Sequence, residues 1–266
     1  MSSITTDQGI LHYETFGRGR PVILLHGWLG SWGLWREVMT WLGQYYRTYA
    51  LDFWGFGDSG RKLNTYQVND FVSMVNQFME QMGILSAPLV GHSMGGTVSL
   101  SVAIHHPERV QKVVIIGSPV VGSSLALPLK FAGYRPIAFL LFSFFPAFRA
   151  TMKVASPMIC RDPEFPAMMD RDLSKTTLES FLVSIATLRK TDLRPQVGRI
   201  KVPVMGMFGD RDNIVSPREW QTLKTGLPAA RIERFKTAGH FIMLDEPRLF
   251  MDTLKDFLDN STGGAA

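Results

Sequence analysis

The fold of this chain is decided by one stretch, Ala87-Pro88-Leu89-Val90-Gly91-His92-Ser93-Met94-Gly95-Gly96-Thr97. A short apolar run stops at glycine, serine and glycine and then continues into a helix-forming pattern. Gly91, Ser93 and Gly95 fit the pattern G-x-S-x-G, in which a serine occupies a sharp turn from a strand into a helix. Side chains at the flanking positions would clash there. The pattern predicts that Ser93 exposes its hydroxyl above a helix N-terminus, where backbone N–H groups favour negative charge.

The alternative is an ordinary glycine-rich turn with a capping serine. A histidine and an acid farther along the chain favour a nucleophile instead. His240 lies in a loop of small residues, Thr237 to Gly239, which suits a base that must reach sideways. Asp210 and Asp212 both follow an apolar strand expected at Val202 to Phe208, and they compete for the role of the acid. We favour Asp212, because an acid at a strand's C-terminal end shares the nucleophile's edge of the sheet; Asp210 could instead fix the turn.

A second glycine-containing loop follows the apolar strand expected at Arg20 to His26. The loop begins His26-Gly27-Trp28-Leu29-Gly30 and can turn a backbone N–H group toward the top of the sheet. Acyl transfer needs two such donors for the oxyanion of its tetrahedral intermediate. We assign them to the N–H groups of Trp28 and Met94. We expect His26 to be a structural hydrogen-bonding residue and not a catalyst.

Length and composition describe a globular protein. The 266 residues suffice for one large domain or two small ones, with 45% hydrophobic and 19% charged residues. The single cysteine, Cys160, excludes an intrachain disulfide. The first residues lack a basic segment followed by an apolar one, so we expect no secretory signal and a cytoplasmic protein.

Strands and helices alternate with short connections on both sides of a central segment, which predicts a mainly parallel sheet with helices on both faces. This core is assigned to residues 1–118 and 201–266. Strands are expected at 10–16, 20–26, 45–51, 110–117, 202–208 and 231–235, besides the one before Ser93; helices are expected at 66–82, 98–104 and 246–258.

The alternation stops between residues 119 and 200, where eight prolines separate short apolar pieces. We assign this segment to an inserted helical cap, with its last helix at 177–189. Its first half is rich in phenylalanine, and we expect Phe139 and Phe142 to bind substrate together with Phe241 of the histidine loop. The alternatives are packing inside the cap and an interfacial patch that touches lipid or another subunit. A membrane span is not expected, because Ile137 to Phe145 is far shorter than the roughly 20 apolar residues required.

The net charge of +5 arises within the same central segment. Residues 119–200 hold eleven Lys or Arg against six Asp or Glu, and the rest of the chain is balanced. These charges are scattered singly, which is typical of solvated surface and argues against nucleic-acid binding. His105 and His106 have no Cys or carboxylate at metal-ligand spacing, so we expect no metal and no cofactor.

Together these motifs resemble the α/β-hydrolase family over nearly the whole chain. The similar positions are the oxyanion loop at His26-Gly27-Trp28, the Asp-x-x-Gly-x-Gly-x-Ser turn from Asp52, the nucleophile turn, the acid turn and the histidine loop. The order serine, aspartate, histidine also matches. The resemblance implies an α/β-hydrolase fold with a mostly parallel eight-stranded sheet, helices on both faces and an inserted helical cap. Within the family, the chain is most similar to small carboxylesterases and cofactor-free perhydrolases.

The resemblance implies a serine hydrolase that cleaves carboxylic esters of apolar acyl or aryl groups through an acyl-enzyme. The implied partner is a small-molecule ester, and the chain is expected to be a monomer or homodimer without membrane contact. Carbon–carbon bond hydrolases share the pattern, but their histidine is usually followed by tryptophan, whereas Phe241 follows here. A receptor-like hydrolase with a signalling role is the remaining alternative. Dehalogenases and epoxide hydrolases use an aspartate where this chain has Ser93.

Overall fold

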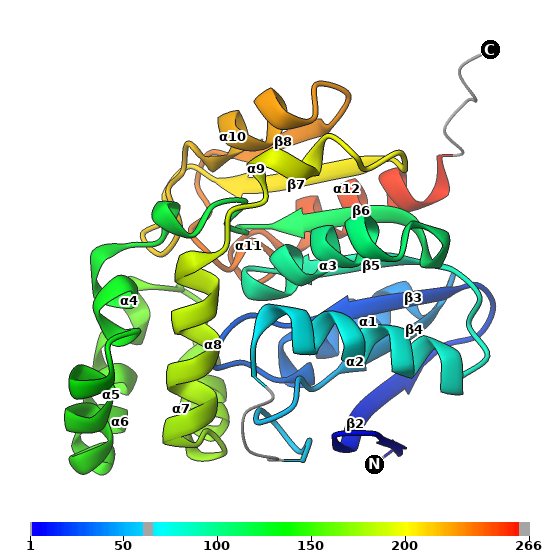
Figure 1. Ribbon diagram of the computed structural model, residues 1–266. Helices are drawn as coiled ribbons and strands as arrows, with labels where there is room; N and C mark the ends of the chain where they lie inside the picture. Colours follow the sequence, from blue (N-terminus) through cyan, green and yellow to red (C-terminus); the bar gives the residue numbers. More distant parts are fainter. Residues whose placement is uncertain (1, 61–65, 261–266) are drawn as a thin grey trace.

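The computed structural model describes residues 2–60 and 66–260. Within them, eight strands form one sheet in the order β1-β2-β4-β3-β5-β6-β7-β8 (Figure 1). The strands are β1 Ser2–Thr6, β2 Gly9–Phe16, β3 Pro21–Leu25, β4 Arg47–Leu51, β5 Ala87–His92, β6 Val110–Ile116, β7 Val204–Gly209 and β8 Arg231–Phe235. Only the pairs β1–β2 and β2–β4 are antiparallel, which confirms the predicted mostly parallel sheet.

The first strand, β1, is absent from the sequence prediction. It contains a single large apolar residue, Ile4, so its alternation is weak. It forms because β2 supplies its hydrogen-bond partners, in a register that runs from Ser2 opposite Tyr13 to Thr6 opposite Gly9. Pairing at the sheet edge thus outweighs local preference.

Helices cover both faces of the sheet, and alternate residues of the central strands face the two sides. On β3, Ile23 and Leu25 pack with α2 and α3, whereas Val22 and Leu24 pack with α1 and α12. Burial on both faces explains the nearly continuous apolar runs of these strands. The core helices are α1 Arg36–Leu42, α2 Val68–Gln81, α3 Met94–His105, α10 Glu219–Gly226, α11 Ile242–Asp245 and α12 Pro247–Asp259. Short 3-10 helices lie at Trp32–Trp35, Pro107–Arg109, Gly122–Ser124 and Ser156–Met158.

The chain between β6 and β7 is helical and lies beyond the carboxyl ends of the strands (Figure 1). Five of its six α-helices carry proline in their first two positions, where the missing N–H is not needed. The prolines therefore start helices in this segment. The six are α4 Leu127–Ala132, α5 Arg135–Ser143, α6 Phe145–Ala155, α7 Phe165–Ser174, α8 Leu178–Lys190 and α9 Arg194–Val197.

Buried polar contacts attach this helical segment to the sheet. Val121 and Asp192 form an isolated bridge that places the entry and exit of the segment side by side. Glu219 of α10 accepts hydrogen bonds from the N–H groups of Val120 and Val121, at 2.7 and 2.9 Å. Burial raises the pKa of Glu219 above its usual value, and these two backbone hydrogen bonds, together with one from the Thr222 hydroxyl, oppose that shift.

No single helix in the described ranges is long and apolar enough to cross a membrane. The helices at Arg135–Ser143 and Phe145–Met158 reach the required length and hydropathy only when they are taken together, and the chain bends by 94° between them.

Candidate active site

Ser93 occupies the turn between β5 and α3 in a strained backbone conformation. Its φ of 53° and ψ of −118° are rare for a residue with a side chain and cost of order 1–3 kcal/mol. The turn is held by a 2.8 Å hydrogen bond from the Ser93 N–H to the carbonyl of Ile116. A Cβ added at Gly91 would lie 2.3 Å from the Gly95 carbonyl, and one at Gly95 would lie 2.3 Å from that of Leu25. Close backbone packing therefore requires both glycines, as G-x-S-x-G predicts.

The structure brings His240 to Asp212. Nδ1 of His240 lies 2.8 Å from Oδ2 of Asp212, and both side chains are buried. The second oxygen, Oδ1, accepts hydrogen bonds from the N–H groups of Ile214 and Val215 at 2.8 and 2.9 Å. Because a carboxylate only accepts, Nδ1 carries the proton and Nε2 is left with its lone pair.

The competing acid, Asp210, lies elsewhere. Its carboxylate contacts the Arg234 guanidinium at 2.9 Å, and a quarter of its side chain is exposed. Of the two aspartates in the acid turn, Asp212 is thus the one that bonds to His240.

Ser93 and His240 line the same cavity, which has a volume of about 120 Å³. Its wall is mostly apolar and comes from both parts of the fold. The loop that begins at His26 and the loop that contains His240 provide Trp28 and Phe241, and helices α6 and α7 provide Met152, Phe165 and Met168. A carbonyl group bound in this cavity would therefore share it with Ser93 and His240, in an environment with few competing hydrogen-bond partners.

Two phenylalanines expected to bind substrate do not line this cavity. Phe139 is 64% exposed on the outer side of α5. Phe142 stacks on Phe145 with ring centroids 4.6 Å apart and packs edge-on against Phe181 of α8. The two phenylalanines do not reach the cavity because α5 packs against α8. The helices whose residues face the cavity are α6 and α7. Because α5 is apolar on several sides, its sequence cannot indicate which side faces a ligand.

Four residues of α7 that were not predicted to be site residues do line the cavity. Phe165, Met168, Met169 and Asp172 follow the helical spacing i, i+3, i+4, i+7 and so share one face. This helical spacing is the sequence signal that could have identified the side of α7 that faces the cavity.

Asp172 is the carboxylate of that face and is 4% exposed. Its Oδ1 accepts hydrogen bonds from the Ser31 hydroxyl at 2.9 Å and from Nε of Arg171 at 3.2 Å. Burial raises the pKa of Asp172 to about 6, against the opposing effect of the Arg171 charge. The cavity wall therefore gains a negative charge as the pH rises through about 6.

The loop from His26 lies directly against the serine turn. A Cβ added at Gly27 would be 3.1 Å from Cβ of Ser93. His26 holds the loop because its Nε2 accepts a hydrogen bond from the Phe53 N–H at 3.0 Å, and Nδ1 then donates to the Gly27 carbonyl at 2.7 Å. Burial lowers the pKa of His26, which is consistent with a neutral structural ring. In the described part of the chain, the N–H groups of the next residue, Trp28, and of Met94 donate no hydrogen bond.

His92 is a further residue that the motif does not reveal, because it occupies a variable position of G-x-S-x-G. Its Nε2 lies 3.1 Å from the carbonyl oxygen of His240, and its ring lies 4.6 Å from that of His240. Burial, together with the neighbouring His240, lowers its pKa well below the usual value. A neutral His92 with the proton on Nε2 thus holds the backbone of the histidine loop.

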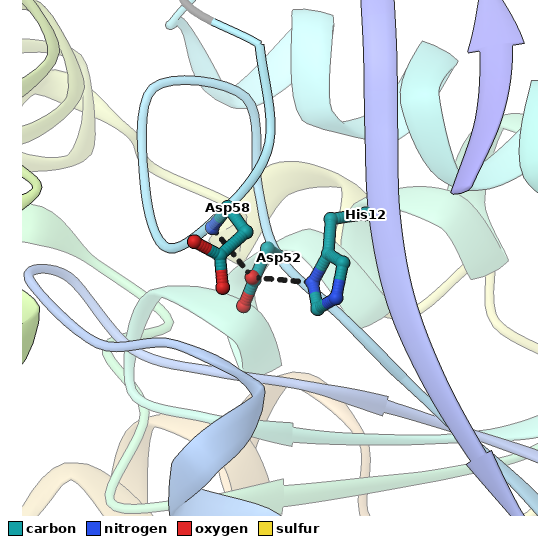
Figure 2. A group of neighbouring side chains, drawn as sticks. All are labelled: His12, Asp52 and Asp58. Atoms are coloured by element: carbon teal, nitrogen blue, oxygen red, sulfur yellow. Dashed lines mark hydrogen bonds and ion pairs between the residues drawn. The ribbon is translucent and has the colours of Figure 1, made fainter. Parts of the chain in front are cut away.

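Among the residues that the structure describes, one group of side chains has metal-ligating atoms within 4.8 Å of one another: His12, Asp52 and Asp58, which lie outside the cavity (Figure 2). Hydrogen bonds and ion pairs already occupy these atoms. Oδ2 of Asp52 accepts from Nδ1 of His12 and from the Asp58 N–H, both at 2.8 Å, and its Oδ1 accepts from the Trp32 N–H at 2.6 Å. Asp58 pairs with Lys175 at 2.6 Å. Although burial opposes it, the hydrogen bond and charge of Asp52 raise the pKa of His12. The group connects β2 to the segments that contain Trp32 and Asp58.

Comparison with known proteins agrees with this architecture. The family model of the alpha/beta hydrolase fold matches residues 20–155. The chain is 25% identical over 256 residues to the pimeloyl-(acyl-carrier protein) methyl ester esterase of Vibrio vulnificus, covering 93% of this chain and 97% of that protein. It is 28% identical over 266 residues to the 2-hydroxy-6-oxo-6-phenylhexa-2,4-dienoate hydrolase of Comamonas testosteroni, covering 94% and 91%. An esterase structure from Exiguobacterium antarcticum superposes with a TM-score of 0.85 at 21% identity, covering 97% and 99%. This chain belongs to the α/β-hydrolase fold family and is a hydrolase.

Proposed function

We propose that this hydrolase cleaves carboxylic esters of short apolar acyl or aryl groups, with Ser93 as the nucleophile. One observation carries the proposal. The Asp212 carboxylate holds the proton of His240 on Nδ1, which leaves Nε2 as a base in the cavity that Ser93 also lines. A serine hydroxyl becomes a useful nucleophile only beside such a base.

In the proposed reaction, His240 takes the proton of Ser93 Oγ as that oxygen attacks the ester carbonyl. The imidazolium then returns the proton to the leaving alcohol, and Asp212 stabilises its charge. Water repeats the cycle on the acyl-enzyme and releases the acid. The free N–H groups of Trp28 and Met94 stabilise the oxyanion, each contributing about 3 kcal/mol of barrier reduction, as measured for similar donors elsewhere.

We further propose that residues 119–200 form a cap over a core made of residues 1–118 and 201–266. The cavity supports this division, since α6 and α7 provide one wall and the loops after β3, β5 and β8 provide the other. Its volume of about 120 Å³ is close to that of an apolar protein cavity of about 150 Å³ that takes benzene. The acyl or aryl group is therefore a short chain or a single ring.

The test is hydrolysis of aryl esters with acyl chains from acetate to octanoate by the wild type and by Ser93→Ala. We expect at least about a 10⁴-fold loss of kcat in the variant. Ser99→Ala is the matched control, because Ser99 is buried like Ser93 but lies within α3, where its hydroxyl bonds to the Gly95 carbonyl. Activity should fall for the longest chains. Full activity of Ser93→Ala, with Ser99→Ala unchanged, would remove Ser93 from the mechanism.

A second candidate function is hydrolysis of a carbon–carbon bond in a vinylogous diketone. The similarity to the Comamonas testosteroni hydrolase favours it. The same residues could serve, because such a bond also breaks after attack on a carbonyl. Adding a vinylogous diketone to the ester panel distinguishes the two. The substrate with the higher kcat/KM in the wild type identifies the reaction class.

A further inference from the structure

Large apolar side chains are concentrated on the outer surface of α4, α5 and α6 and of the short segments that connect and follow these helices. The described residues include fourteen exposed large hydrophobic side chains, and nine of them lie between residues 127 and 158. We call these nine the α4–α6 patch; it includes Phe131, Phe139, Leu140 and Phe144. In Figure 1 these green helices form the part of the molecule farthest from the sheet, at the lower left. Such a concentration marks an interaction surface.

Helix α5 at the centre of the patch is apolar on opposite sides. Its inner side packs Ala138 and Phe142 against Phe181 of α8. Its outer side carries Leu140 and, just after the helix ends, Phe144, which are 60% and 65% exposed. A helix that is apolar all round belongs inside a protein or in lipid. The described part of the chain therefore supplies no partner for this outer side.

The charges within the segment that carries the patch have one sign, and the acidic residues Asp162 and Glu164 follow it directly. Residues 125–161 contain five Lys or Arg and no Asp or Glu. Arg149 pairs with Asp170 at 2.8 Å. In the described part of the chain, Arg135, Lys153 and Arg161 are exposed and form no ion pair. An occupant of the patch must therefore combine an apolar body with negative charge.

We propose that the α4–α6 patch docks onto the surface of a bilayer that contains anionic phospholipids. Phe, Leu and Met side chains would enter the boundary between headgroups and acyl chains, and the basic residues would face the phosphates. A second copy of the chain fits less well, because pairing two patches would bring like charges together. The helices lie on the surface and do not cross it, since α5 has 9 residues and α6 has 11, against roughly 20 for a span.

Docking would also bring the bilayer close to the cavity. Helix α6 turns Met152 toward the cavity and exposes Val154, which is 82% exposed on its outer side. One short helix thus separates the proposed lipid surface from the cavity. Docking itself does not depend on the proposed ester hydrolysis and is tested separately from it.

The experiment is co-sedimentation of the full chain with vesicles of phosphatidylglycerol and phosphatidylcholine in equal parts, and with phosphatidylcholine alone. We expect the wild type to bind the mixed vesicles and to be released by high salt. The double variant Leu140→Ser/Phe144→Ser should bind about tenfold more weakly or worse, because it loses two apolar side chains. Arg135→Gln/Lys153→Gln should bind about thirtyfold more weakly, since each basic residue near an anionic surface contributes about fivefold.

The matched control is Leu85→Ser, which removes a side chain that is 82% exposed but lies before β5, outside the patch. It should bind vesicles as the wild type does. Circular dichroism and hydrolysis of a soluble ester without vesicles establish that each variant is folded. Equal sedimentation of wild type and patch variants would overturn the proposal. A second result would also overturn it. Light scattering would show that the wild type is a dimer and that Leu140→Ser/Phe144→Ser is a monomer, and the wild type would bind no vesicles. A second copy of the chain would then occupy the patch.

Discussion

Replacing Asp172 with asparagine should change how the stability of the protein depends on pH. Asp172 is 4% exposed beside the cavity, and burial raises its pKa from an ordinary 3.8 to about 6. Between these two values the folded protein binds a proton that the unfolded chain has already released. The free energy of unfolding of the wild type therefore falls as the pH rises through this window, and the loss is complete above about pH 6.

The size of the effect follows from the two pKa values. Each pH unit between the folded and unfolded pKa corresponds to about 1.4 kcal/mol, so the whole window corresponds to about 3 kcal/mol. Asparagine cannot ionise, and its amide oxygen can still accept the hydrogen bond of Ser31. The free energy of unfolding of Asp172→Asn, relative to the wild type, should therefore rise by about 3 kcal/mol between about pH 4 and about pH 7.

The assay is urea unfolding of both proteins, followed by tryptophan fluorescence, at several pH values across the window. Asp192→Asn is the control with the opposite sign. Hydrogen bonds from the Arg194 guanidinium lower the pKa of Asp192, so removing that charge costs stability at neutral pH and the cost disappears as the pH falls. The expected result is that the free energy of unfolding of Asp172→Asn minus that of the wild type rises with pH. If this difference is independent of pH, or falls as the pH rises, the predicted pKa effect of Asp172 is refuted.

Three further substitutions test the site and its attachment to the sheet. Asp212→Asn should lower kcat on a soluble ester about 10⁴-fold, because the imidazole loses its correct tautomer; a loss below tenfold would argue against Asp212 as the acid. Gly117→Ala, at a φ of +53°, places a Cβ 3.1 Å from Nδ1 of His240, so kcat should fall and stability should drop by about 1 kcal/mol; unchanged kinetics would contradict this geometry. Glu219→Ala leaves two backbone N–H groups without their acceptor, so the free energy of unfolding measured in urea should fall by about 2 kcal/mol or more. A free energy of unfolding within experimental error of the wild type would show that water replaces the carboxylate.

Local signals in the sequence predict the elements that depend on neighbouring residues. The glycines around Ser93 predict its turn because the five-residue pattern is itself a local signal. Gly91 is required by the backbone of Gly95, four residues on, whereas Gly95 is required by the Leu25 carbonyl on the neighbouring strand β3. The periodicity of α8 and its capping residue Thr177 likewise predict a helix within one residue of its observed ends. The edge strand β1 could not be predicted in this way, because its stability comes from pairing with β2.

The sequence by itself determined the α/β order of the chain, the strained serine turn and the identity of the residues able to act as base and acid. Only the tertiary structure showed that Asp212, and not Asp210, bonds to His240, placed α7 instead of Phe139 and Phe142 at the cavity, and gave Asp172 its perturbed pKa. The physical reason is distance along the chain. Periodicity and turn chemistry act over a few residues, whereas burial, pairing and the choice of an inner helix face depend on segments that folding alone brings together.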